Sequence, residues 1–463
     1  MSSIFGLLGS ARTGLHAHGF GMSVASQNAQ NATTEGYTRR DVRLSAIEPP
    51  PPGGGGVQVR GSRRIMDSFI ERRVLGATAA RAEASAREEA LGVLDRVLAE
   101  VEGGLASSLD DLEVAFTRLT DRPADPAARG EVLAAAERLS TAFAQSAAQL
   151  DAAREDIDGR IEAEVEGLSD TLSQIGDLGV RIQRAEISGR EASDLRDQRD
   201  QLVRELSEVL PVTTLEDDNG GLSVRLGGLS LVTSDGRAAE LTVAPDPATG
   251  SMRILRETAG VDQDVTALVD GGTLGGLVAA RDGALSDTGA ALDQLAFDLA
   301  AAYNGVHTVG YGQDGASGRA LFATTAGADG AAAAFSVSAD VAGQPDRLAA
   351  ALDPAVTAGD NRNALALAAV ADSDVALGGT GTAQQALSSM IGSAGRAVRD
   401  ARLDAGYADD FAQQLESLRQ SVSGVSVDEE MIELSKFQRS YQASLRIVEA
   451  ADQMLQELVN LKR

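Results

Sequence analysis

The sequence predicts a mainly α-helical protein, a long helical rod with paired N- and C-terminal coiled-coil helices and a small inserted β domain. Three observations support this fold class. Apolar residues recur at a mean step of 3.5 at both ends of the chain, which is the spacing of a coiled-coil seam. Residues 127–188 keep a helical apolar stripe without an internal cap, which predicts one helix of about 60 residues, or ~90 Å. Residues 212–265 instead alternate between apolar and polar side chains, as strands do.

The division of the chain follows these changes of period. The proline run at 49–52 and the glycine run at 53–56 separate the first helix from the rod, and a turn at 217–221 opens the β region. The expected segments are an N-terminal coiled-coil helix at 1–35, the first part of the helical rod at 36–211, a small β insert at 212–265, the second part of the rod at 266–315, a β and loop insert at 316–345, the third part of the rod at 346–427, and a C-terminal coiled-coil helix at 428–463 that pairs with 1–35.

The two terminal stripes have similar lengths, which favours pairing of the chain ends with each other or with neighbouring copies. Their apolar side chains are few for the conformational entropy of ordering about 70 residues. We therefore hypothesise that both ends become ordered when neighbouring subunits cover them. The residues expected to form this assembly interface are Ile4, Leu8, Leu15, Met22, Met431, Leu434, Tyr441, Leu445, Val448 and Leu455.

Composition excludes several functional classes. The chain has 463 residues, more than one compact core usually holds, and its net charge of −27 disfavours nucleic acid and membrane surfaces as partners. It contains no Cys and only three His, so zinc-thiolate sites, disulfides and thiol nucleophiles are absent from the sequence. No segment approaches the roughly 18–20 apolar residues of a membrane span. We expect no catalytic residues, no metal and no cofactor, and therefore no enzyme.

Isolated chemical motifs have ordinary structural interpretations. Residues 310–315 match G-x-G-x-x-G, but a helix precedes them and a Gly/Ala/Ser-rich loop follows, the reverse of a dinucleotide site. The acidic cluster at 217–220 does not complete a calcium loop. His16 and His18 point to different faces of a helix, and His307 lies at a helix end.

Residues 28–39, with Asn28, Asn31, Gly36 and Tyr37, resemble the signature of bacterial flagellar rod, hook and hook-associated proteins. The C-terminal stretches 423–430 and 434–443 are similar to the hook-associated protein 1 family. Four internal stretches resemble the same family and occur in its order along the chain: 125–129, 197–203, 274–277 and 360–363. The β parts at 212–265 and 316–345 match weakly.

This resemblance implies a structural axial protein of the flagellum that forms the hook–filament junction by polymerising through its terminal helices. The implied partners are other copies in an oligomeric ring, the hook protein, and the second junction protein or the filament side. A flagellar export chaperone would hold the C-terminal helix. The implied location is extracellular, reached through type III export without a cleaved signal peptide, and the first 14 residues indeed lack a basic region before their apolar patch.

Two other interpretations stay open. One is another flagellar axial component, either hook, rod or second junction protein, against which the stretches 197–201 and 360–363 argue. The other is an acidic coiled-coil scaffold, which would need neither terminal pairing nor export. A secreted enzyme with catalytic residues on the β insert is disfavoured because no nucleophile and base stand out among so few histidines.

Overall fold

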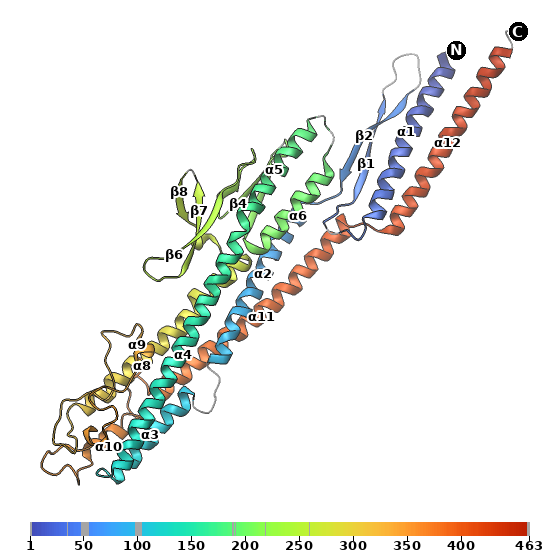
Figure 1. The fold of residues 1–463 in the computed structure, drawn as a ribbon. Helices are drawn as coiled ribbons and strands as arrows, with labels where there is room; N and C mark the ends of the chain where they lie inside the picture. The colour runs from blue at the N-terminus through green and yellow to red at the C-terminus, as the bar shows by residue number, and fades with distance from the viewer. Residues whose placement is uncertain are drawn as a thin grey trace.

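The computed structural model describes residues 2–34, 36–47, 55–97, 104–187, 189, 191–217, 219–258 and 260–460. The molecule is elongated, and both chain ends lie at the same tip (Figure 1). A terminal unit occupies that tip, a helical rod forms the middle, and short helices and loops form the opposite tip. This architecture agrees with the predicted fold class.

The terminal unit consists of the first and last helices and a β-hairpin. Helix α1 (Ser2–Gln30) packs along α12 (Val427–Asn460), so the predicted pairing of the terminal helices is confirmed, and the two helices run antiparallel. The hairpin joins β1 (Arg40–Ile47) to β2 (Gly56–Arg64) and covers another side of α1. The expectation of helical rod from residue 36 missed this hairpin. The proline run at 49–52 lies outside the described residues, as do Met1, Glu35 and 461–463 of the predicted terminal segments.

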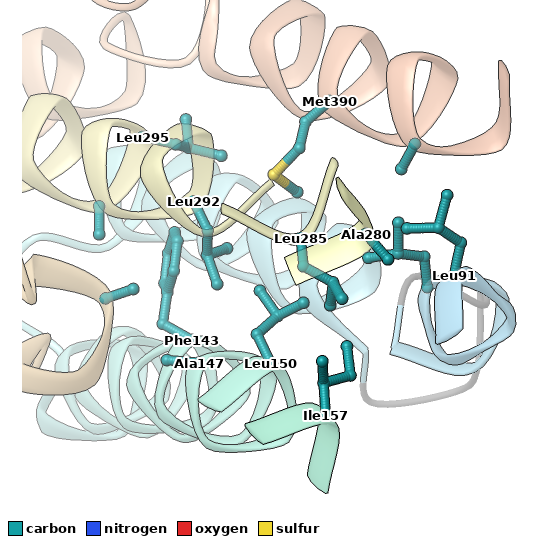
Figure 2. Close-up of a cluster of buried hydrophobic side chains, with 14 of the residues drawn as sticks. Leu91, Phe143, Ala147, Leu150, Ile157, Ala280, Leu285, Leu292, Leu295 and Met390 are labelled. Carbon is teal, nitrogen blue, oxygen red and sulfur yellow. The ribbon is translucent and has the colours of Figure 1, made fainter. Parts of the chain in front are cut away.

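The rod is built from long helices that share one core. Its helices are α2 (Ser68–Val97), α3 (Leu105–Asp121), α4 (Pro126–Glu166), α5 (Leu168–Glu186), α6 (Ser193–Val209), α7 (Gly272–Ala280), α8 (Ser286–His307) and α11 (Ala383–Ser423). A π-helical turn, η2 (Arg281–Leu285), links α7 to α8. Side chains from α2, α4, η2, α8 and α11 meet in the middle of the rod (Figure 2). Burial of these large apolar groups is what stabilises the rod.

The predicted helix over 127–188 is divided in two at Gly167, which ends α4 and precedes α5. The start of α4 follows the sequence closely. Asp125 accepts a hydrogen bond from the Ala127 amide at 3.0 Å, and Pro126 takes the first helical position, where its missing N–H is harmless.

The β insert extends from residue 212 to 264 as expected and forms two antiparallel three-stranded sheets. Their strands are β3 (Val212–Glu216), β4 (Leu222–Leu226) and β5 (Leu229–Val232), then β6 (Glu240–Pro245), β7 (Met252–Thr258) and β8 (Val261–Asp264). The insert lies against α5, where a Cβ on Gly176 would stand 2.3 Å from the carbonyl oxygen of Gly236. Only glycine permits this backbone contact.

The opposite tip contains α9 (Ala331–Ala334), α10 (Arg362–Ala368) and the 3₁₀ turn η3 (Pro345–Arg347), while another 3₁₀ turn, η1 (Thr266–Leu268), follows β8. Residues 316–345, all of which the structure describes, form no strand where a β and loop insert was expected; they make only an isolated bridge between Phe322 and Val337. Their aromatic residues instead join the rod core, since Phe335 lies 4.7 Å from Phe143 between ring centroids. Among the described residues, no helix combines the length and apolarity that crossing a membrane requires.

Candidate assembly site

The contact between α1 and α12 is built from small side chains. A Cβ on Gly21 would stand 2.6 Å from the ring of Phe437, and one on Gly14 would stand 3.1 Å from the Ser444 hydroxyl. Ala17, between them, is fully buried. The two helices therefore approach more closely than a leucine seam would allow.

The contact repeats every seven residues on both helices. Gly14, Gly21 and Asn28 face Ser444, Phe437 and Glu430 in turn. This heptad period is the coiled-coil spacing that the sequence predicts, but it runs through different residues. On α1, the closest contacts are made one residue before the predicted Leu15 and Met22.

The predicted interface residues fall into two groups. Half-buried positions are occupied by Ile4, Leu8, Leu15, Met22, Leu434, Tyr441, Val448 and Leu455. Met431 and Leu445 are exposed, by 52% and 40%. Both lie one residue after a contact residue of α12, Glu430 and Ser444, because the sequence pattern follows apolar side chains whereas the closest approach involves small ones.

The side of the pair that faces solvent carries large apolar groups. The exposed apolar residues of the two helices are Phe5, Leu7, Val427, Met431, Ile432, Leu445, Ile447, Met454 and Val459. Large apolar side chains of both helices are therefore exposed to solvent, where another protein can cover them.

Asn28 organises the polar end of the terminal unit. It is 1% exposed, and its amide nitrogen donates to Glu430 Oε2 and to the Arg40 carbonyl, both at 2.9 Å. Its oxygen accepts from the Tyr37 hydroxyl at 2.8 Å and from the Arg40 amide at 3.1 Å. Arg39 pairs with the other oxygen of Glu430 at 2.8 Å. Asn28 therefore ties α1, the start of β1 and α12 together.

The other signature residues shape the turn between α1 and β1. Gly36 has a φ of +76°, which favours glycine. Asn31 donates to the Gln27 carbonyl at 2.9 Å and accepts from Thr34 at 3.2 Å. Tyr37 lies under the Arg40 guanidinium, 4.8 Å from the ring centroid, and burial raises the pKa of its hydroxyl although Arg40 opposes the shift.

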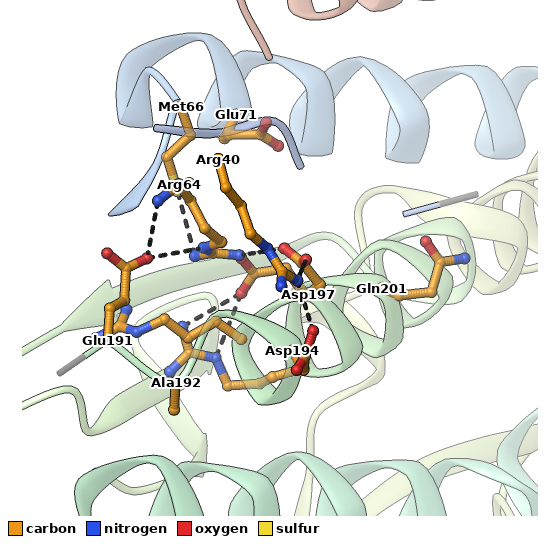
Figure 3. A network of polar contacts seen from close by, with 12 residues as sticks. Arg40, Arg64, Met66, Glu71, Glu191, Ala192, Asp194, Asp197 and Gln201 are labelled. Carbon is orange, nitrogen blue, oxygen red and sulfur yellow. Dashed lines mark hydrogen bonds and ion pairs between the residues drawn. The ribbon is translucent and has the colours of Figure 1, made fainter. Parts of the chain in front are cut away.

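A second polar network fastens the hairpin to α6 (Figure 3). Arg40 reaches Asp194 at 2.6 Å and Asp197 at 3.0 Å, and Arg64 reaches Asp197 at 3.0 Å and Asp200 at 2.7 Å. Burial alone would raise the pKa of Asp200, but Arg64 and Arg199 outweigh it, so that pKa is lowered. Arg40, which directly follows the stretch 28–39, thus connects it to the stretch 197–203, which also carries the family resemblance.

The remaining stretches of resemblance are also packing points. Arg129 is fully buried and donates to the carbonyls of Pro123 and Leu348, both at 2.6 Å. Asn361 donates to the Thr120 carbonyl at 2.8 Å. A Cβ on Gly276 would stand 2.1 Å from the Glu83 carbonyl oxygen, so α7 lies directly on α2.

The isolated motifs take structural roles. His307 is buried: its Nε2 accepts from the Ala349 amide at 2.9 Å, so Nδ1 donates to the Arg319 carbonyl at 2.8 Å. Burial lowers its pKa, which keeps the ring neutral. Asp217 accepts from the amides of Asn219 and Gly221, as a turn residue does. A Cβ on Gly310 would meet Asn363. The part of the chain that the structure describes holds no group of three potential metal ligands.

Comparisons with known proteins agree with this architecture. The family model of the flagellar hook-associated protein FlgK helical domain matches residues 91–322, half of the chain, and that of the flagellar basal body rod FlgEFG protein C-terminal region matches residues 419–461. Flagellar hook-associated protein 1 of Salmonella typhimurium is 26% identical and is aligned over 98% of this chain and 100% of its own length. The same-named protein of Bacillus subtilis is 27% identical, with 99% of both chains covered.

A solved structure shows the same fold. The flagellar hook junction protein FlgK from Burkholderia pseudomallei superposes with a TM-score of 0.67 at 17% identity, covering 76% of this chain and 100% of that one. Together with the helical-domain match, these similarities identify the chain as a member of the FlgK family of flagellar hook-associated proteins, structural components found at the hook–filament junction.

Proposed function

We propose that copies of this chain assemble side by side through the α1–α12 pair and so form one layer of the hook–filament junction. Family membership already makes the chain a structural component of the flagellum that associates with itself and with other flagellar parts. The proposal adds the surface: segments 1–35 and 428–463 assemble, while the rod parts and the two inserts project from them.

The exposed apolar face of the terminal pair carries this proposal. The closest contacts within the pair are made at Gly14, Gly21 and Asn28, whereas Met431, Leu445 and other large apolar groups point to solvent. A pair stabilised only by its own contact would place its large side chains inside. Covering them with neighbouring copies removes this apolar area from water, which favours assembly.

The finer partners are part of the same proposal. One end of the layer would contact the hook protein, and the other the second junction protein or the filament side. An export chaperone would cover the apolar face of α12 before assembly, and the chain would reach the cell exterior by type III export without a cleaved signal. An acidic coiled-coil scaffold is disfavoured, because a scaffold gives no reason for the match to hook-associated proteins along the whole chain.

The variant Leu445→Asp tests the proposal. A charge on the exposed face should block incorporation into flagella and abolish motility while leaving the helical content of the purified chain unchanged. Gln442→Asp is the matched control, since it adds the same charge at an exposed position of the same helix. Immunodetection on isolated flagella, with motility in soft agar, provides the measurement.

If Leu445→Asp is incorporated as well as Gln442→Asp, the α12 face is not an assembly surface. If Leu445→Asp instead loses its helical signal or precipitates, Leu445 acts within the fold of the single chain and the proposal is also wrong.

A further inference from the structure

A patch of positive charge interrupts an otherwise acidic molecule. Residues 40–64 contain five arginines and two acidic residues, within a chain of net charge −27. Arg40 and Arg64 point inward to α6, as described above. Arg43, Arg60 and Arg63 are exposed, and none of them forms an ion pair with a carboxylate of the described residues. We call these three residues the arginine patch.

The arginine patch lies on the outward face of the hairpin. Val57 contacts α1 through its amide, which donates to the Thr13 hydroxyl at 3.3 Å. Ser45 and Arg43 are two residues apart on β1, so their side chains share one face of the hairpin. Arg60, the extra residue of a bulge in β2, reaches that face and donates a hydrogen bond to the Ser45 hydroxyl at 3.0 Å.

Helix α11 carries a surface of complementary chemistry. Residues 403–418 contain four acidic residues and no basic one. Asp404 is paired with Arg87 and Glu416 with Arg419, while Asp409 and Asp410 have no ion-pair partner within the described ranges. Asp410 lies on an outer face of α11 that also carries large exposed side chains, whereas the half-buried Asp409 does not. The exposed apolar residues of this face are Leu403, Tyr407, Phe411, Leu418 and Val422.

This aromatic and acidic surface of α11 lacks a partner in the single chain. Tyr407 is 70% exposed and Phe411 47% exposed, while the opposite face of α11, with Ala412 and Leu415, packs on α2. Arginine binds both features of such a surface, since it pairs with carboxylates and stacks on aromatic rings. Arg and Tyr are also the residues that contribute most to the centres of protein interfaces.

The net charge of the chain indicates which partner binds the exposed surface of α11. A chain of charge −27 repels its own copies, so a contact in which unlike charges meet favours assembly. We propose that the arginine patch of one copy binds the surface around Asp410, Tyr407 and Phe411 of a second copy. This inference rests on the proposed self-assembly and adds a contact outside the terminal helices.

The contact joins two different surfaces, so each copy can bind one neighbour through its hairpin and another through α11. Such heterologous contacts propagate into rings or helical arrays. The hairpin lies beside α1, whereas α11 runs down the rod beyond the terminal unit (Figure 1). Neighbouring copies would therefore be displaced along the long axis.

Because the chain contains no Cys, engineered cysteines can test the contact. The double variant Arg60→Cys with Asp410→Cys, oxidised in isolated flagella, should give a ladder of covalent multimers on non-reducing gels. A pair with Arg225→Cys in place of Arg60→Cys is the control, because Arg225 is an exposed arginine on the β insert. A ladder that is absent from the Arg60 variant, or equally strong in the control, would overturn the inference.

Charge exchange provides a second measurement. The triple variant of Arg43, Arg60 and Arg63 to Glu should lower incorporation into flagella on the order of tenfold, and adding Asp410→Arg should restore it. Arg225→Glu should leave incorporation unchanged. Full incorporation of the triple variant refutes this contact and leaves the proposed function standing, whereas absence of the unaltered chain from flagella refutes the proposed function itself.

Discussion

The terminal unit and the rod differ in the side chains that they bury between their helices. The rod buries large apolar side chains such as Phe116, Phe143 and Tyr303. The terminal pair makes its closest contacts through small residues such as Gly14 and Gly21, and it leaves large apolar side chains such as Met431 and Leu445 exposed. The rod therefore has an apolar core of its own, whereas the terminal pair leaves apolar side chains of the kind found in cores exposed to its surroundings. Four predictions test this difference, in order of decreasing expected effect.

Removal of a rod side chain should have the largest effect on stability. Phe143 is fully buried and packs on Phe335, so Phe143→Ala should lower the free energy of unfolding by about 3–5 kcal/mol. Thermal unfolding followed by circular dichroism measures it. Val114→Ala, at an exposed apolar position of α3, should change the free energy by less than about 0.5 kcal/mol. Equal effects of the two variants would show that the rod lacks a tight core.

Amide exchange should separate the two regions directly. In the single chain, amides of α1 and α12 should open with a free energy at least about 3 kcal/mol below that of α4, roughly a hundredfold in exchange rate. Hydrogen–deuterium exchange with mass spectrometry measures this. The difference should shrink in isolated flagella, where neighbours cover the pair. Strong protection of both terminal helices in the free chain would contradict the hypothesis that neighbouring copies order them.

A methyl group at the helix contact should weaken the terminal pair alone. Gly21→Ala places a Cβ against the Phe437 ring and should destabilise the pair by about 1–3 kcal/mol. Faster exchange of α1 and α12, with unchanged melting of the rod, would be the signature. Gly9→Ala meets no atom within 4 Å and should stabilise α1 by up to about 1 kcal/mol. If Gly21→Ala behaves like Gly9→Ala, the close approach of the helices is not required.

Acid should loosen the connection between the two regions, with the smallest effect of the four. The pKa of Asp200 is lowered in the folded chain, because Arg64 and Arg199 outweigh burial. As the pH falls, Asp200 therefore takes up its proton in the unfolded chain before it does so in the folded chain. The stabilisation is complete above a pH of about 4 and is lost as the pH drops through the lower pKa of the folded chain. Exchange of the β1 and β2 amides between pH 5 and pH 3 measures it, and Asp200→Asn should flatten the dependence. An unchanged slope in that variant would assign the effect to other carboxylates.

The sequence predicts those features of the fold that depend on the spacing of apolar residues. The long helices, the pairing of the chain ends and the β insert at 212–264 all follow from regular apolar spacing. The exact face of the terminal contact does not, because hydrophobic patterns give weight to Leu15 and Met22 and none to Gly14 and Gly21. A search for small residues at a spacing of seven would have found that face.

The hydrogen bonds around Asn28 cannot be predicted from any local sequence pattern. Asn28 and Tyr37 are recognisable as a signature, but their partner Glu430 lies 402 residues from Asn28. The hairpin escapes detection for a different reason: its strands combine valines with arginines, two of which turn inward to the acidic residues of α6. Charged residues inside a sheet obscure the alternation that indicates a strand.

The hydrogen bond between Asn28 and Glu430 also has a consequence for quality control. A chain interrupted anywhere before α12 has no partner for Gly14, Gly21 or Asn28, however well its rod has folded. Since the two helices close a loop that spans nearly the whole polypeptide, only a finished molecule can display the paired surface. A flagellum under assembly can thus exclude truncated copies of the chain, because these copies lack the paired surface.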